Sequence, residues 1–271
     1  MPFIVAVVMA IALLAATGCS AGPTETQEDS FTVTGPVRLV VNSENGKIEV
    51  NAGPDDEVRV VAILRGVNRI DYEVSQDGNT ITVDAEITSG WFYSAEVDIT
   101  ITAPANTDVE LETSNGLIEL NDIEGTGTLK TSNGKIVLQN VKGDFEGRTS
   151  NGRIEVYTME GTALLRTSNG RLDLQGVTGE VDAETGNGNI AFSGDLTAGG
   201  NNRLVTSNGN VVVELLGTPS VNLAASTSNG EVTSKLEITA TTTSDEHLVG
   251  TIGDGEADLY INTSNGDVTI R

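Results

Sequence analysis

Apolar and polar residues alternate in short runs through most of the chain, at a fixed position relative to a recurring Thr-Ser-Asn-Gly motif. Apolar or small residues lie six and four positions before the asparagine, as at Val181 and Ala183, and three and five positions after it, as at Ile136 and Leu138. A period of two on both sides of a turn is typical of short, half-buried strands. The pattern therefore predicts two short strands in each repeat.

The asparagines of the motif set the period of the chain. Four successive gaps between them are 18 residues, two are 21 and the last is 36, which is twice 18. A fixed period is the sequence signature of a stacked repeat architecture. We interpret these asparagines as structural turn residues, and they are Asn115, Asn133, Asn151, Asn169, Asn187, Asn208, Asn229 and Asn265.

Each repeat is expected to turn at two corners. Asn-Gly supplies positive φ at the first corner, and a glycine marks the second, at Gly125, Gly143, Gly161 and Gly179. Asn-Gly is also a hairpin signal, so an antiparallel meander is the alternative architecture. Only stacked coils require equal spacing, because equivalent residues then form ladders. The sequence therefore favours an all-β, parallel β-solenoid with coils of about 18 residues.

The threonine two positions before each asparagine shares its parity with the core residues. Thr113, Thr131, Thr149 and Thr167 are therefore expected to point inward, beside an asparagine ladder at the corner. This orientation disfavours an ice-binding face, for which regular outward threonines are needed.

Four segments follow one another along the chain. Residues 1–18 are interpreted as a lipoprotein signal peptide, because a short apolar run ends in small residues. Residues 19–30 are small, polar and acidic, which predicts a disordered tether. Residues 31–104 predict an N-terminal β cap and a first coil, with a hairpin at Asp77-Gly78, and residues 105–271 predict the β-solenoid repeats.

Ala16-Thr17-Gly18-Cys19 resembles the lipobox of bacterial lipoproteins, in which the cysteine becomes the lipidated first residue. Cys19 is the sole cysteine, so the chain cannot form an internal disulfide, and the alternative role is an incidental thiol. Several acyl chains give stable membrane attachment. The resemblance implies an exported protein that is anchored through Cys19 in the bacterial cell envelope. Ser20 implies the outer membrane if the bacterium has two membranes.

Composition agrees with an all-β protein and narrows its partners. The 271 residues include 31 glycines and 4% aromatic residues, and the net charge is −24. Glycine-rich turns and short strands rich in Thr and Val are typical of all-β proteins. Because phosphate binding requires a basic surface, the acidity argues against a nucleic acid partner.

Two groups of residues are candidate binding sites. Three consecutive aromatics, Trp91, Phe92 and Tyr93, either plug the core or form a platform for a sugar ring or a partner. Six basic residues recur beside the corner, with Lys130, Arg148 and Arg166 before it and Lys135, Arg153 and Arg171 after it. Stacking would align them in two basic ladders. Glu146, Glu155 and Asp173 either neutralise them as surface ion pairs, or the ladders dock an anionic glycan or a lipid headgroup.

The sequence offers little for catalysis. His247 is the only histidine and lies 18 residues after Asn229, which favours a degenerate turn. No nucleophile triad, Cys/His metal spacing or phosphate loop is evident, so no catalytic residue, metal site or cofactor is predicted. Asp254, Glu256 and Asp258 are interpreted as a solvated loop and not as a calcium site.

The Thr-Ser-Asn-Gly-x-Ile-x-Leu units, the Thr-Ala-Pro segment before them and the Gly-Thr-Ile-Gly-x-Gly ending resemble the bacterial putative-adhesin family of β-strand-repeat domains, over about residues 31–271. The family has no assigned function, and the resemblance implies an extracytoplasmic β-solenoid without enzymatic activity. We therefore expect a non-enzymatic cell-envelope lipoprotein with a binding or structural surface. The alternatives are an envelope-stress or sensing component that binds a protein partner, and a polysaccharide-active β-helix enzyme, which uniform coils without a cleft disfavour.

Overall fold

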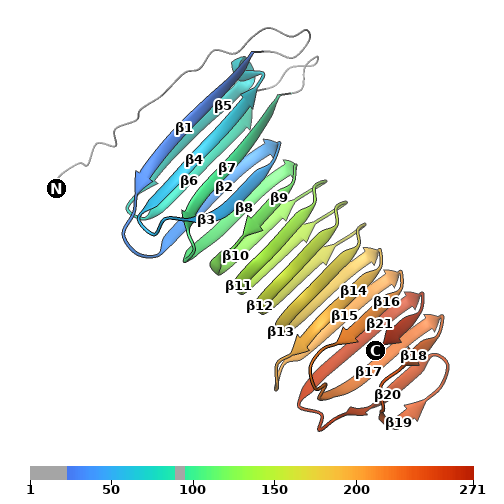
Figure 1. Cartoon of the computed structure of the whole chain (residues 1–271). Coiled ribbons are helices and arrows are strands. Elements are labelled where there is room, and N and C mark those ends of the chain that lie inside the picture. Colours follow the sequence, from blue (N-terminus) through green and yellow to red (C-terminus); the bar gives the residue numbers. More distant parts are fainter. Residues whose placement is uncertain (1–22, 89–94) are drawn as a thin grey trace. The chain divides into compact units, whose positions relative to one another are not determined.

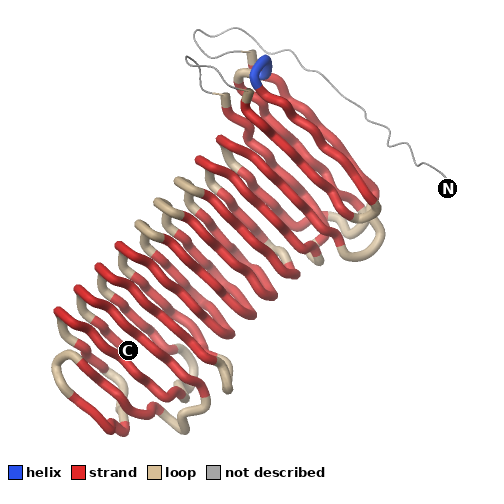
Figure 2. Tube along the Cα trace, turned by 180° about the vertical axis from the view of Figure 1, so that it is seen from behind, coloured by secondary structure: helices blue, strands red, loops and turns tan. Residues whose placement is uncertain are grey.

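The computed structural model describes residues 23–88 and 95–271, and this part of the chain is all-β (Figure 1). It contains 22 strands and one short 3-10 helix, η1 (Val67–Arg69), which is the helical segment drawn in Figure 2. No helix within the described ranges is long and apolar enough to cross a membrane. The chain separates into two compact units, one ending at Lys130 and one from Thr131 to Arg271.

The N-terminal unit holds two coils of the solenoid and a cap. Its strands are β1 (Thr24–Thr32), β2 (Val37–Asn45), β3 (Ile48–Gly53), β4 (Glu57–Arg65), β5 (Ile70–Asp77), β6 (Thr80–Ile87), β7 (Glu96–Pro104), β8 (Thr107–Asn115), β9 (Ile118–Asn121) and β10 (Glu124–Thr131). β2 and β3 form the first coil, and β8 and β9 stack on it in parallel. Asn45 lies opposite Asn115, so the corner asparagines align.

The cap covers the other edge of the first coil. β6 pairs in parallel with β2, and β5 pairs with β6 in the hairpin predicted at Asp77-Gly78. β7 pairs in parallel with β3, β4 pairs antiparallel with β7, and β1 pairs antiparallel with β4. The two layers of the solenoid therefore continue into the cap and end in antiparallel strands.

Strand β1 corrects the prediction for the tether. Residues 24–30 are not a free tether but pair with β4, from Thr24 opposite Arg65 to Thr32 opposite Glu57. A sheet edge offers unpaired backbone groups, so strand addition does not need an apolar sequence. The acidic side chains of β1 fall on both faces of the sheet, with Glu28 on the exposed face and Asp29 half-buried on the face of Phe31.

The C-terminal unit is built from stacked coils. Its strands are β11 (Ile136–Thr149), β12 (Ile154–Thr167), β13 (Leu172–Asn187), β14 (Ile190–Leu196), β15 (Asn201–Asn208), β16 (Val211–Leu215), β17 (Val221–Asn229), β18 (Val232–Ser234), β19 (Thr239–Thr243), β20 (His247–Ile252), β21 (Ala257–Asn265) and β22 (Val268–Ile270). Ile136 lies opposite Ile154, and Ile154 lies opposite Leu172, in parallel pairs. Successive coils are thus one 18-residue repeat apart, which confirms the solenoid and excludes the meander.

The first corner needs glycine for a reason other than the one expected. Gly152 and Gly170 do not have a left-handed φ. A Cβ at Gly152 would lie 1.6 Å from the carbonyl oxygen of Gly134, and one at Gly170 would lie 1.8 Å from that of Gly152. The corner glycine is therefore required because the backbone of the preceding coil packs directly against it.

At the second corner the strands bend without being interrupted, whereas the sequence predicted a turn between two strands. β11, β12 and β13 run through it as continuous strands, with a left-handed residue at Asn140 (φ 51°), Thr158 (φ 61°) and Gly176 (φ 67°). The predicted glycines follow three residues later, as at Gly161, whose φ is 129°. Each of these three coils is thus bent by a pair of positive-φ positions.

The threonines of the motif point inward, as predicted. Thr113, Thr131, Thr149 and Thr167 are all buried. Thr149 Oγ1 donates a hydrogen bond to the carbonyl oxygen of Gly134 at 3.1 Å and accepts one from the backbone N–H of Gly152 at 3.1 Å. Thr149 therefore satisfies backbone groups at the corner and ties adjacent coils together, and Thr167 and Thr185 donate in the same way to Gly152 and Gly170, whereas the buried Thr113 hydroxyl makes no such bond.

The last coil does not stack in chain order. β21 lies between β15 and β17, and β22 lies between β16 and β18 (Figure 1). β20 pairs antiparallel with the outer side of β17, and β19 pairs antiparallel with β20. His247 begins β20 opposite Ser226, so it is not the degenerate corner that its spacing predicted.

Candidate functional site

Five of the predicted basic residues lie beside the asparagine corner of the C-terminal unit. We call them the basic strip, and they are Lys135, Arg148, Arg153, Arg166 and Arg171. Arg148 lies opposite Arg166 in the pairing of β11 with β12, as the ladder requires. Lys130 is exposed and is the last residue of the other unit.

Carboxylates pair with the cations of the basic strip. Arg148 pairs with Glu146, and Arg171 pairs with Asp173, each within its own coil. The arginine side chains stay 54% and 55% exposed in these pairs. Solvent-exposed pairs of this kind contribute little to stability. The carboxylates therefore moderate the charge of the strip without locking the arginines in place.

Arg166 is held more firmly, in a network that sequence reasoning did not foresee. It pairs with Asp182, which also lies 3.4 Å from Arg203 Nη1. Arg203 pairs in turn with Glu184 at 2.7 Å. Arg203 and Arg166 occupy different positions of the repeat. Counted back from the asparagine of its own motif, Arg203 lies two residues further away than Arg166. Comparing residues at one repeat position therefore does not find Arg203.

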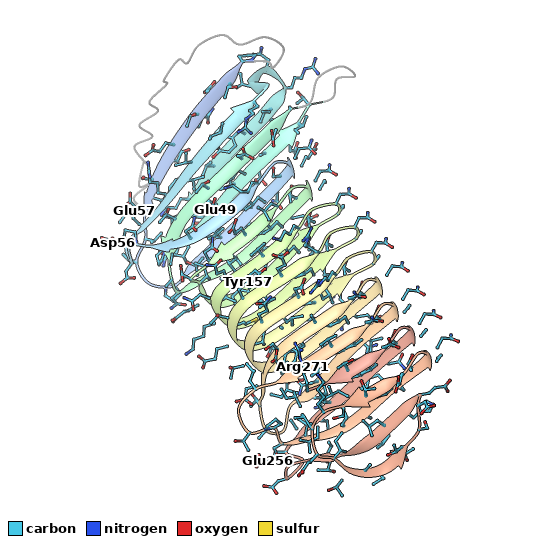
Figure 3. All side chains as sticks on the ribbon, turned by 45° about the vertical axis from the view of Figure 1, so that its right-hand side comes forward. Glu49, Asp56, Glu57, Tyr157, Glu256 and Arg271 are labelled. Atoms are coloured by element: carbon cyan, nitrogen blue, oxygen red, sulfur yellow. The ribbon has the colours of Figure 1, made fainter. Side chains whose placement is uncertain are left out.

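Glu155 is the most buried charged group of the site. It lies on the outer face of β12 but is only 7% exposed, because neighbouring side chains cover it. Lys135 Nζ lies 2.5 Å from Glu155 Oε2, and the Tyr157 hydroxyl donates to the same oxygen at 2.9 Å (Tyr157 is labelled in Figure 3). Burial raises the pKa of Glu155, but the bonds from Lys135 and Tyr157 and the charge of Arg153 outweigh it and leave the pKa below its usual value.

A shallow hollow of about 490 Å³ opens beside the corner. Its polar lining includes Arg148, Arg166, Ser168, Asn169 and Asn187, together with the carboxylate of Glu184, which lies 3.8 Å from Arg166 Nε. Guanidinium and amide groups together are suited to phosphate or carboxylate oxygens. Here the structure brings part of the predicted basic ladder and part of the asparagine ladder into one concave surface.

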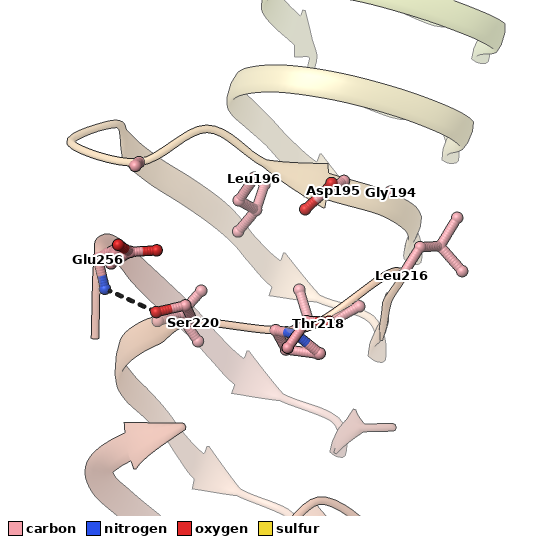
Figure 4. Close-up of a pocket in the computed structure, with 11 residues that line it drawn as sticks. Gly194, Asp195, Leu196, Leu216, Thr218, Ser220 and Glu256 are labelled. Carbon is pink, nitrogen blue, oxygen red and sulfur yellow. Dashed lines mark hydrogen bonds between the residues drawn. The ribbon is translucent and has the colours of Figure 1, made fainter. Parts of the chain in front are cut away.

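A second hollow lies where the chain leaves β16 and passes to β17 (Figure 4). It has a volume of about 90 Å³, and Asp195 and Glu256 are its charged residues. The backbone N–H of Glu256 donates to Ser220 Oγ at 3.2 Å across it. We interpret this hollow as a consequence of the crossover that makes room for β21 and β22.

The remaining sequence candidates are Cys19, three aromatic residues and His247. Cys19 and the aromatic residues Trp91, Phe92 and Tyr93 lie outside the described residues. His247 is exposed, on the antiparallel edge of the C-terminal unit. Within residues 23–88 and 95–271, no group of three or more His, Cys, Asp or Glu side chains is placed to hold a metal ion.

One family model and several solved structures are similar to the chain. A family model described as Toastrack DUF4097 matches residues 37–271. A "putative adhesin" from Bacteroides fragilis is 14% identical, with coverage of 91% of this chain and 97% of that one and a TM-score of 0.47. From Parabacteroides distasonis, a "putative adhesin" is 11% identical (TM-score 0.43) and a "putative lipid binding protein" is 12% identical (TM-score 0.39), each with the same coverage of 91% and 97%. No curated protein matches the sequence.

Proposed function

The chain belongs to the Toastrack DUF4097 family, and from this premise we propose that it is a non-enzymatic binding protein of the bacterial cell envelope. The proposed ligand is a polymer or lipid headgroup that carries phosphate or carboxylate groups. The proposed site is the basic strip with the hollow beside it.

One observation carries this proposal. In a chain with a net charge of −24, Arg148 and Arg166 line the same hollow as Asn169 and Asn187. Positive groups that collect locally on an acidic protein attract an anion to that place and not elsewhere. Arginine can bind a phosphate or carboxylate with two parallel hydrogen bonds, which the exposed pair with Glu146 does not prevent.

The repetition of the strip favours binding over catalysis. Stacked coils present equivalent side chains about 4.8 Å apart. Such a ladder is suited to a ligand with repeated anionic groups, whereas hydrolysis requires one unique acid–base pair at one bond. The proposal needs no cofactor.

The test is a quadruple variant of the strip, Arg148→Gln, Arg153→Gln, Arg166→Gln and Arg171→Gln. Binding is measured by retention on beads that carry polygalacturonate or poly(glycerol phosphate), and by co-sedimentation with vesicles of phosphatidylglycerol or phosphatidylcholine. We expect the unmodified chain to bind at least one anionic probe at low salt and the variant to lose that binding. Binding to the polymers but not the vesicles would indicate an anionic polymer, a glycan if polygalacturonate is the one bound, and the reverse would indicate a headgroup.

A charge-matched control separates the strip from overall charge. Arg38, Arg59 and Arg271 have side chains that are 62%, 49% and 50% exposed, and Lys235 is also exposed. Changing these four to Gln alters the net charge by the same amount and should leave binding intact. Equal loss in both variants, or none in either, would refute the proposal, and release of shortened polymer would show an enzyme instead.

Membrane attachment through Cys19 belongs to the same proposal. Growth with radioactive palmitate should label the chain and leave it in the membrane fraction. Cys19→Ser should abolish the labelling and release the protein. Unlabelled wild-type protein would exclude the lipid anchor without affecting the binding proposal.

A further inference from the structure

The outer face of β21, β17 and β20 carries a trough of apolar residues. Tyr260 lies opposite Ala224, and Ala224 lies opposite Val249. Tyr260 and Val249 are 45% and 40% exposed, which is unusual for large apolar side chains in the described part of this chain. Because adjacent strands are about 4.8 Å apart, the two walls are roughly 10 Å apart, with only the methyl group of Ala224 on the floor.

Polar residues lie at both ends of the trough. Two residues back along the strands, Asn222 lies opposite both Asp258 and Thr251. Asn222 Nδ2 donates to the carbonyl oxygen of Gly255 at 2.9 Å and to Asp258 Oδ1 at 3.3 Å. Thr251 Oγ1 donates to Asn222 Oδ1 at 3.3 Å. These bonds hold the three side chains in place and leave Asp258 with free acceptor capacity.

The other end of the trough is also polar. Ser226 lies opposite Asn262 and His247, two residues further along the same strands. Asn262 Nδ2 donates to Ser226 Oγ at 2.8 Å. The surface therefore changes from polar to apolar and back to polar along the direction of the strands.

The trough is concave. A hollow of about 310 Å³ is lined by Tyr260, Ala224, Val249, Asn222 and Thr241 among others. β19 shifts register between Ala240 and Thr242, and Thr241 Oγ1 donates to the carbonyl oxygen of Val249 at 3.3 Å. Bulges re-aim side chains and are common beside binding sites. Here the bulge brings Thr241 to the rim of the hollow.

We propose that this trough binds an uncharged pyranose ring of a polysaccharide. A pyranose has an apolar C–H face and a rim of hydroxyl groups, which match the Tyr260 ring and the polar residues at either end. Tyrosine offers a rigid apolar surface with a polar tip at low entropic cost. Asp258 would accept a hydrogen bond from a sugar hydroxyl, as amide and carboxylate groups do in small-ligand sites.

Local charge selects an uncharged sugar over an anionic one. Asp258 is the charged residue of the trough's lining, and the chain as a whole has a net charge of −24. Arg203 lies opposite Tyr260 on β15, but its charge is engaged by Glu184 at 2.7 Å. A uronic acid or phosphate would therefore be repelled here. This site is separate from the basic strip and does not depend on the function proposed for it.

The test measures sugar binding to the full chain by calorimetry and by saturation-transfer NMR. The probes are maltohexaose, cellohexaose and the hexamer of N-acetylglucosamine, which are all uncharged. We expect millimolar binding of at least one. Tyr260→Ala should weaken it about tenfold, Tyr260→Phe should retain most of it, and Asn222→Ala should weaken it by removing the support of Asp258.

Leu216→Ala is the matched control. Leu216 is 41% exposed in the same unit but lies outside the trough, so its removal should not change sugar binding. Circular dichroism would show that each variant is folded, as expected for exposed positions. The quadruple arginine variant of the basic strip should also keep its sugar binding.

Three results would overturn the proposal. One is the absence of binding to all three sugars. Another is undiminished binding by both Tyr260→Ala and Asn222→Ala. The third is a dimer that Tyr260→Ala dissociates and that no sugar affects, because the trough would then be an interface between copies of the chain.

Discussion

Asn265 Nδ2 donates a hydrogen bond to Asn208 Oδ1 at 2.8 Å, although Asn229 lies between them in the sequence. Asn229 in turn donates to Asn265 Oδ1 at 3.0 Å. The ladder thus runs from Asn208 through Asn265 to Asn229. The final coil is inserted between two coils that precede it, so the 36-residue gap is not an additional coil with a missing corner.

The inserted coil should be essential for the outer part of the C-terminal unit. Deleting residues 256–271 would remove β21 and β22, on which β17 and β18 stack. We expect residues 221–252 to become sensitive to protease and the urea midpoint to fall. Limited proteolysis with mass spectrometry measures this, with deletion of Arg271 alone as the control. Unchanged protection of residues 221–252 would contradict the inserted topology.

The inward threonines should contribute through their hydroxyl groups. Thr149→Val keeps the shape of the side chain but leaves the carbonyl of Gly134 and the N–H of Gly152 without the bonds they make to Thr149. Unsatisfied buried groups cost about 1–3 kcal/mol, so unfolding free energy should fall by about that amount. Urea unfolding measures it. Thr149→Ser should lose less, and the exposed Ser150→Ala should change little.

Thr158 should be a site of backbone strain. It is β-branched and left-handed, with a φ of 61°, whereas the equivalent positions are Asn140 and Gly176. A left-handed conformation costs an ordinary residue about 1–2 kcal/mol, and asparagine tolerates it better. Thr158→Asn should therefore stabilise the protein by about 1 kcal/mol in thermal unfolding. The control variant Thr162→Asn, at an exposed position of the same coil, should not increase stability. A Thr158→Asn protein that is less stable than the wild type would argue against backbone strain at Thr158.

Glu155 should make stability depend on pH. Its pKa is below the usual value of 4.5 in the folded state. Because the folded pKa is lowered, the stabilisation is present above the unfolded pKa and is lost as pH falls through the folded pKa. Glu155→Gln should therefore be less stable than the wild type at pH 7, and this deficit should shrink below about pH 4.5. Urea unfolding across that range measures the difference, and a deficit that does not change with pH would contradict it.

The repeat made much of the fold predictable. Each coil has its own copy of the motif, so local signals such as alternation, the inward Thr149 and the corner Asn151 were enough to predict a parallel stack. The basic strip followed from the same period, because Arg148 and Arg166 occupy the same repeat position. Their pairing with Glu146 and Asp182 was only partly foreseen, since Asp182 belongs to the next coil.

Features that depend on long-range contact were not predictable in this way. The acidic sequence of residues 24–30 indicated a tether, but the free edge of β4 recruits it as a strand. Tyr260, Ala224 and Val249 are unremarkable in sequence, and they form a trough only because β17 pairs with β21 on one side and β20 on the other.

The sequence by itself determined the coil, since one repeat contains its own turn residues, its alternating core positions and its inward threonine. Only the tertiary structure decided the order of the final coils, the network around Arg166 and the composition of the trough. The physical reason is that any coil with this motif can stack on any other. The stacking order that puts Asn265 between Asn208 and Asn229 depends on the crossovers of the chain and on the antiparallel strands at the end of the C-terminal unit. No local sequence pattern encodes the crossovers or the antiparallel strands.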